Sequence, residues 1–178
     1  MSNEILVKIK SLYKALIDML HNPTLHISLI RAVPRMAEID PDKIIMMDSL
    51  KFMMHIANAD GDISQREVNI ISYITDTYFT IEVLENLIND DFLDDIDEIP
   101  LSIKLFCELE NLLYKNGAAA DFDSSILNIL ITYFSGLGVL ISEADGYNSR
   151  LERLEIENYL DTIKEYASKH TLSPFFEF

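Results

Sequence analysis

The sequence predicts an all-α protein of about eight helices packed into one compact bundle. Apolar residues recur at three- and four-residue steps along nearly the whole chain, which is the period of an amphipathic helix. No segment alternates apolar and polar residues between turns as a half-buried strand does. The length of 178 residues suits a single domain over 1–178, and 49% hydrophobic residues are enough to build its core.

The first three helices are expected in the opening third of the chain. An apolar stripe predicts a helix over 5–20, and a second helix is expected over about 24–38, kinked or ended early by Pro34. An aspartate followed by proline at 40–41 is the usual start of a helix, with the aspartate as N-cap. This third helix should stop at the glycine-containing turn 58–61.

The middle of the chain predicts two further helices and an acidic connector. A helix is expected from 65 to about Tyr78, followed by a shorter one over 80–89. The connector 90–98 then holds 6 carboxylates in 9 residues. Such a run is either a solvated link between helices or a docking site for a basic partner.

Three more helices are expected in the last part of the chain. Pro100 should start a helix that runs to about Lys115. Asp123 or Ser124 is the expected N-cap of the next helix, which ends near residue 143, and the last long helix spans about 150–169.

An internal repeat is the most informative feature of the sequence. Residues 59–67 match residues 144–152 in the frame A-D-G-x-x-S-x-x-E, at an offset of 85 residues. Each copy follows an apolar helix and precedes a capped one, so the longer repeated units are about 44–79 and 126–168. We interpret this pattern as a duplication, and two such helix–acidic loop–helix units are expected to pack around one core.

One interpretation of the repeated loops is metal binding. The candidate ligands are Asp60, Asp62 and Glu67 in the first copy and Asp145 and Glu152 in the second. Carboxylate oxygens are the ligands that Ca²⁺, Mg²⁺ and Mn²⁺ prefer, and the glycine lets the chain turn tightly around an ion.

The other interpretation is purely structural. The serine of each copy and the glutamate three residues later have the form of a capping box, which satisfies two free amides at a helix N-terminus. Asp60 and Asp145 precede the cap residue, and capping explains them less well. An EF-hand loop fits poorly, because its first ligand would be Ile56 or Ile141, where an acid is required.

The first motif, within residues 54–67, resembles the signature of TerB-like domains, a family related to tellurite-resistance proteins and to the central region of a membrane-linked DnaJ-like co-chaperone. Residues 137–159 resemble it more weakly, and Tyr147 stands where the first copy has Asp62. The resemblance implies an all-α fold, stress-response roles and surface-associated complexes. It also implicates the first aspartate and the glutamate of each motif in divalent metal binding.

Charge and composition narrow the possible partners. With 14 Lys and Arg against 30 Asp and Glu, the net charge of −16 argues against binding to nucleic acid or to anionic membranes. The charge either keeps the protein soluble or attracts a cationic partner, a metal ion or a protein with a basic surface. We find no catalytic motif, and therefore expect an interaction module rather than an enzyme.

The sequence also indicates where the protein is located and what its C-terminal tail contacts. The lone Cys107, the absence of a visible signal peptide and the lack of a 20-residue apolar run indicate a cytoplasmic protein without direct membrane insertion. The tail 171–178 carries three phenylalanines. Those side chains either dock on this domain or contact another chain.

Overall fold

The computed structural model describes residues 3–22, 40–96, 98–116, 125–144, 146 and 149–172. These residues form seven helices and no strand: α1 (Asn3–Leu20), α3 (Pro41–Ala57), α4 (Gln65–Thr75), α5 (Ile81–Asn89), α6 (Leu101–Lys115), α7 (Ile126–Ser142) and α8 (Arg150–His170). The predicted all-α class is therefore confirmed. None of the helices in these ranges is long and apolar enough to cross a membrane.

The predicted helix over 24–38 lies outside the described residues. Asp40 caps α3 as expected, since its carboxylate accepts the amide of Asp42. Helix α4 ends at Thr75 rather than near Tyr78, because the next residue adopts a left-handed conformation with φ 51°.

The N-terminus of α7 corrects one prediction. Its N-cap is Ser125, whose hydroxyl oxygen accepts the amide of Asn128 at 3.4 Å, so the expectation of Asp123 or Ser124 was wrong by one or two residues. Three polar residues in a row left the choice open from sequence alone, since serine and aspartate are both good caps.

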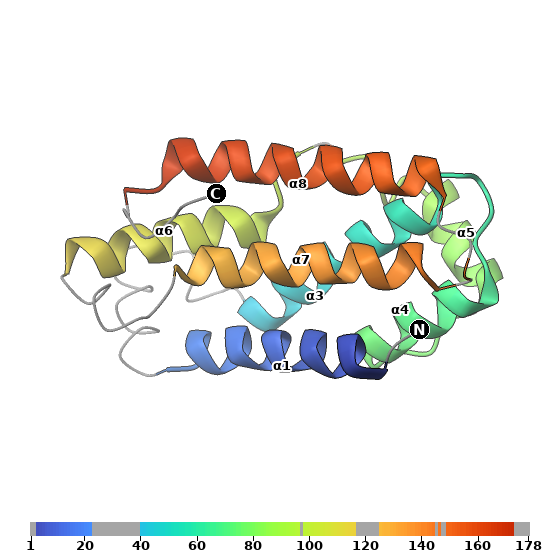
Figure 1. Ribbon diagram of the computed structural model, residues 1–178, viewed down its shortest axis with the longest axis horizontal. Coiled ribbons are helices and arrows are strands. Elements are labelled where there is room, and N and C mark those ends of the chain that lie inside the picture. The colour runs from blue at the N-terminus through green and yellow to red at the C-terminus, as the bar shows by residue number, and fades with distance from the viewer. Residues whose placement is uncertain are drawn as a thin grey trace.

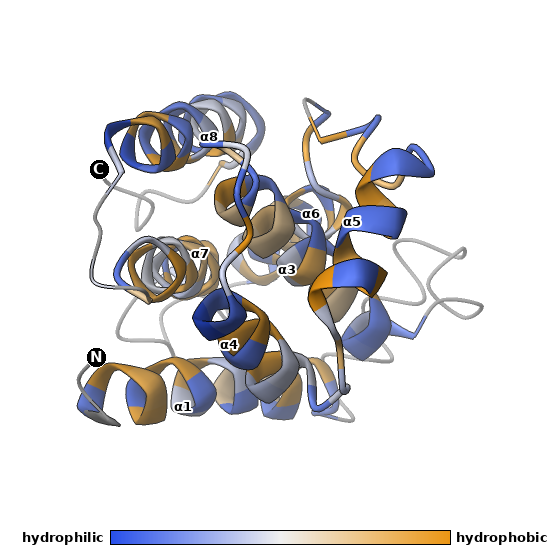
Figure 2. Cartoon of the chain, turned by 90° about the vertical axis from the view of Figure 1, so that its right-hand side faces the viewer, coloured by the Kyte–Doolittle hydropathy of each residue, from blue (hydrophilic) through white to orange (hydrophobic). Residues whose placement is uncertain are grey.

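Helix α7 is the central element of the bundle. It packs between α1 and α8, and α3 and α6 lie beside it (Figures 1 and 2). Two glycines allow the close approach of its neighbours: a Cβ at Gly136 would lie 1.8 Å from Ile9 Cδ1, and one at Gly138 would lie 2.9 Å from Ile156 Cγ1. Such a helix is buried on several sides, which explains why its sequence is apolar and contains no charged residue.

Aromatic side chains join α3, α7 and α8 in the core. The ring of Phe52 lies 4.4 Å from that of Tyr159 and 5.6 Å from that of Phe134, centroid to centroid. The buried hydroxyl of Tyr133 accepts a hydrogen bond from Ser49 at 3.1 Å, which satisfies a polar group inside this core.

Two carboxylates cap the N-termini of helices other than their own. Asp48 on α3 accepts the amide of Ser102 at 2.7 Å, at the start of α6, whose N-cap side chain makes no such bond. Glu110 on α6, only 3% exposed, accepts the amides of Ile126 and Leu127 at 2.9 and 3.4 Å. Negative charge at a helix N-terminus is stabilising, so these acids tie the helices together.

The acidic connector folds back onto the core instead of projecting into solvent. Phe92 and Ile96 pack against core residues, and Asp95 forms an ion pair with Lys51 of α3. The ammonium of Lys51 also lies 5.4 Å from the centre of the Phe92 ring. The connector therefore covers the α3 surface beside α6.

Candidate functional site

The two repeated loops have the same backbone hydrogen bonds. In both, the loop alanine donates to the carbonyl three residues earlier at 3.0 Å, and the loop glycine does the same at 3.0 and 3.3 Å. Gly61 and Gly146 both have left-handed backbones, with φ of 86° and 81°. Only glycine adopts this conformation without strain, so the sequence repeat is matched by a repeat of local geometry.

Both predicted capping boxes are present. The amide of Ser64 donates to Glu67 Oε2 at 2.6 Å, and the amide of Ser149 donates to Glu152 Oε2 at 3.2 Å. Each serine hydroxyl oxygen accepts a backbone amide of its own helix, so each box is complete. The predicted capping role of these four residues is therefore confirmed, and it leaves the second carboxylate oxygen of each glutamate for other contacts.

The structure brings the two motif glutamates together. Glu67 at the start of α4 and Glu152 at the start of α8 are each only 3% exposed, and their carboxyl groups lie within hydrogen-bonding contact. We call them the carboxyl pair. Residues 85 positions apart in the sequence are therefore neighbours at the starts of two helices.

The carboxyl pair changes the acidity of its members. Burial, the charge of Glu67, its hydrogen bond with Glu152 and the more distant charge of Asp60 together raise the pKa of Glu152 to about 8. The bond from the Ser149 amide acts in the opposite direction. Near neutral pH the pair therefore holds one proton.

The remaining predicted ligands are placed differently. Asp60 and Asp62 are exposed on the first loop, where the amide of Asp62 donates to Asp60 Oδ1 at 3.2 Å. Asp145 lies outside the described residues. Within the described ranges no three Asp, Glu, His or Cys side chains gather closely enough to hold a metal ion. The pair and the nearby charge of Asp60 are thus what the structure brings together.

A second ionic contact near the pair had no signal in the sequence. His55, on the last turn of α3, lies with Nε2 3.0 Å from the Glu155 carboxylate of α8. The imidazole is partly buried. These two residues are 100 positions apart, and only the packing of α8 on α3 joins them.

Comparisons with known proteins add no relative. The chain matches no protein-family model, no curated protein and no solved structure.

Proposed function

We propose that this chain is a non-enzymatic protein-interaction module of TerB-like type whose paired acidic loops respond to a divalent cation. The observation that carries the proposal is the carboxyl pair, in which Glu67 and Glu152 from the two motifs are buried against each other. Two carboxyl groups in contact must share a proton or a cation, because two bare charges there repel.

The proposed mechanism is exchange of a proton for a cation. Ca²⁺, Mg²⁺ or Mn²⁺ would displace the proton held by the pair and take oxygen ligands from Glu67 and Glu152. Asp60, Asp62 and Asp145 are the proposed further ligands. Because these acids belong to the two loops, ion binding would order both loops and change the surface offered to a partner.

The proposal also includes a duplicated unit, a cellular location and a kind of partner. The matching hydrogen bonds of the two loops support a duplicated unit over 44–79 and 126–168. We place the protein in the cytoplasm, in a stress-response setting such as tellurite resistance, as the TerB-like resemblance implies. Its net charge of −16 favours a protein partner with a basic surface over a nucleic acid.

Isothermal titration of the metal-free protein with Ca²⁺, Mg²⁺, Mn²⁺ and Zn²⁺ tests the proposal. We expect at least one ion to bind and to release about one proton, seen as a dependence of the heat on the buffer. Glu152→Gln should weaken binding and abolish proton release, whereas Glu157→Gln, an exposed position on the same helix, should change neither. No heat and no thermal shift with any ion would contradict the proposal.

A metal-independent acidic adaptor is the second candidate function. Both glutamates already serve as helix caps, and the described residues hold no ready three-ligand cluster, which favours loops that act only as turns. In that case Asp60→Ala and Asp145→Ala leave partner capture intact with or without a chelator. Neutralising 90–98, or deleting 175–178, would then abolish partner capture.

A further inference from the structure

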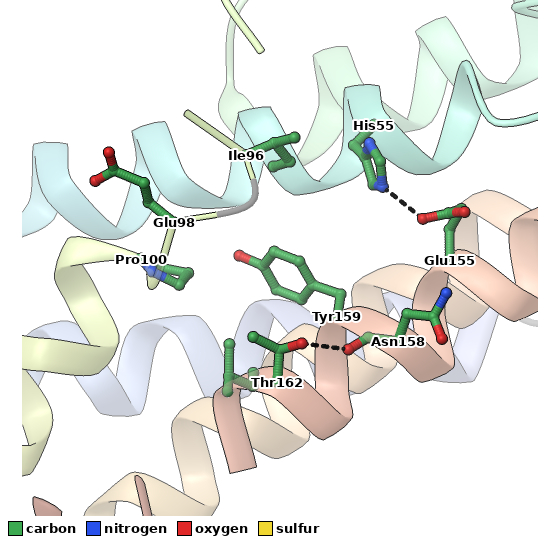
Figure 3. A pocket seen from close by; sticks show the side chains of 9 residues that line it. His55, Ile96, Glu98, Pro100, Glu155, Asn158, Tyr159 and Thr162 are labelled. Atoms are coloured by element: carbon green, nitrogen blue, oxygen red, sulfur yellow. Dashed lines mark hydrogen bonds and ion pairs between the residues drawn. The ribbon is translucent and has the colours of Figure 1, made fainter. Parts of the chain in front are cut away.

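A hollow opens between α3, α6, α8 and the acidic connector, and neither Glu67 nor Glu152 lines it. It consists of two adjoining parts of about 90 and 240 Å³, and Ile96, Glu98, Pro100 and Tyr159 line both. Figure 3 shows the smaller part, with the phenol of Tyr159 extending into it between the His55–Glu155 contact and Pro100. We call the whole hollow the Tyr159 cavity.

Tyr159 is the feature that points to a ligand. The residue is 9% exposed, yet its hydroxyl has no hydrogen-bond partner among the described residues. Ser102 Oγ, and not the Tyr159 hydroxyl, is the enclosed side-chain oxygen left unpaired in the described ranges, so the Tyr159 oxygen is open to the hollow and available to a group that enters it. Burial and the charge of Asp48 raise its pKa, so the phenol stays neutral and able to accept a hydrogen bond.

Two of the basic residues around the cavity are already engaged. Lys51 forms its ion pair with Asp95, and His55 contacts Glu155. These contacts fix two walls of the cavity, formed by the connector and α8. They also leave those bases less available to an incoming anion.

The remaining charges at the cavity favour a cation. The carboxylates of Asp48 and Glu98 have no ion-pair partner in the described part of the chain, and Lys104 is the only other basic residue that lines the cavity. Asp48 also accepts the Ser102 amide, but its charge and that of Glu98 face one remaining lysine, which leaves a negative potential that the overall charge of −16 strengthens.

The size of the cavity limits the ligand. Sites for drug-sized molecules enclose about 300–1,000 Å³. The larger part here, about 240 Å³, suits a group no larger than one long side chain.

We propose that the Tyr159 cavity binds an ammonium or guanidinium group carried on a short alkyl chain. Asp48 and Glu98 act as counter-ions, and the Tyr159 hydroxyl oxygen accepts a hydrogen bond from the group. The group belongs either to a small free amine or guanidine or to a lysine or arginine side chain of a partner. The proposal goes beyond the metal response, because it uses neither Glu67 nor Glu152.

Nuclear magnetic resonance on the full chain tests this site. The probes are n-butylguanidinium, which represents a free small molecule, and an acetylated, amidated Gly-Gly-Arg-Gly-Gly peptide, which represents a protein side chain. We expect at least one probe to shift the Hε1 resonance of His55 saturably and to leave that of His21, which does not line the cavity, unchanged. Competition between the probes identifies whether both use the same site.

Three variants link the binding to named groups. Tyr159→Phe removes only the unpaired hydroxyl, so the fold is kept while binding weakens by about tenfold, the effect of losing a charged hydrogen bond. Glu98→Gln should also weaken binding severalfold. Glu85→Gln, on the exposed side of α5, makes the same change in net charge and should have no effect.

Two outcomes would overturn the proposal. One is the absence of a saturable shift with either probe. The other is that Glu98→Gln and Glu85→Gln weaken probe binding equally, which would show that the probes are attracted only by the net charge. The comparison of those two variants decides the question even where Tyr159→Phe alters folding.

Discussion

Glu152→Gln should make the protein more stable in alkaline solution and change the pH dependence of its unfolding. The pKa of Glu152 is about 8 in the fold and 4.5 for an isolated glutamate. Between these values the folded protein binds a proton that the unfolded chain does not, so the free energy of unfolding falls as pH rises. Complete linkage would amount to about 5 kcal/mol. Solvent near the exposed loops screens the charges of the pair, so we expect the change in the free energy of unfolding to be about 2 kcal/mol.

Glutamine preserves the cap while removing the titration. Its side-chain oxygen can accept the Ser149 amide, and its NH₂ group can donate to Glu67 at every pH. The stability difference between Glu152→Gln and the native protein should therefore be smallest at about pH 5 and grow in favour of the variant up to about pH 8.5.

Urea unfolding followed by far-ultraviolet circular dichroism, with a chelator present, measures this difference. Glu157→Gln, at an exposed position one helical turn and a half away, is the matched control and should show a constant difference across pH. A pH-independent difference for Glu152→Gln, equal to that of the control, would refute the existence of a protonated carboxyl pair.

Three further outcomes follow from packing and capping. Gly136→Ala should destabilise by about 1–3 kcal/mol, since its methyl group overlaps Ile9, and adding Ile9→Ala should recover part of that loss in thermal unfolding. Glu110→Ala leaves two buried amides of α7 unpaired and should cost about 1–3 kcal/mol by urea unfolding, whereas exposed Glu108→Ala should cost little. Gly146→Ala should cost about 1 kcal/mol from its left-handed backbone, measured by thermal unfolding, and equal stability would contradict that conformation.

The helices could be predicted closely because their signals are local. The cap at Asp40, the boxes at Ser64 and Ser149, and the glycine turns each depend on a few neighbouring residues. The helix ends were less certain where several residues could serve, as at Ser125. The contacts between helices had no such local signal.

The candidate site shows the same division. The repeat identified both motifs from sequence, but the meeting of Glu67 and Glu152 depends on how α4 and α8 pack. The capping roles of Asp48 and Glu110 were missed for the same reason, since each serves a helix elsewhere in the chain. In the sequence they look like any other acid on an amphipathic helix.

The acidic residues of this protein fall into two groups: those whose carboxylates bond to helix amides, and those that are only exposed on the surface. Besides the exposed Asp40, which caps α3, the buried or partly buried Asp48, Glu67, Glu110 and Glu152 complete the backbone hydrogen bonding of four helices. Redesign of the surface toward neutral charge, for crystallisation or for lower solubility in salt, should therefore begin with acids such as Glu85 and Glu157, which are exposed. Substitution by lysine at the four buried or partly buried positions would instead remove helix caps and destabilise the fold.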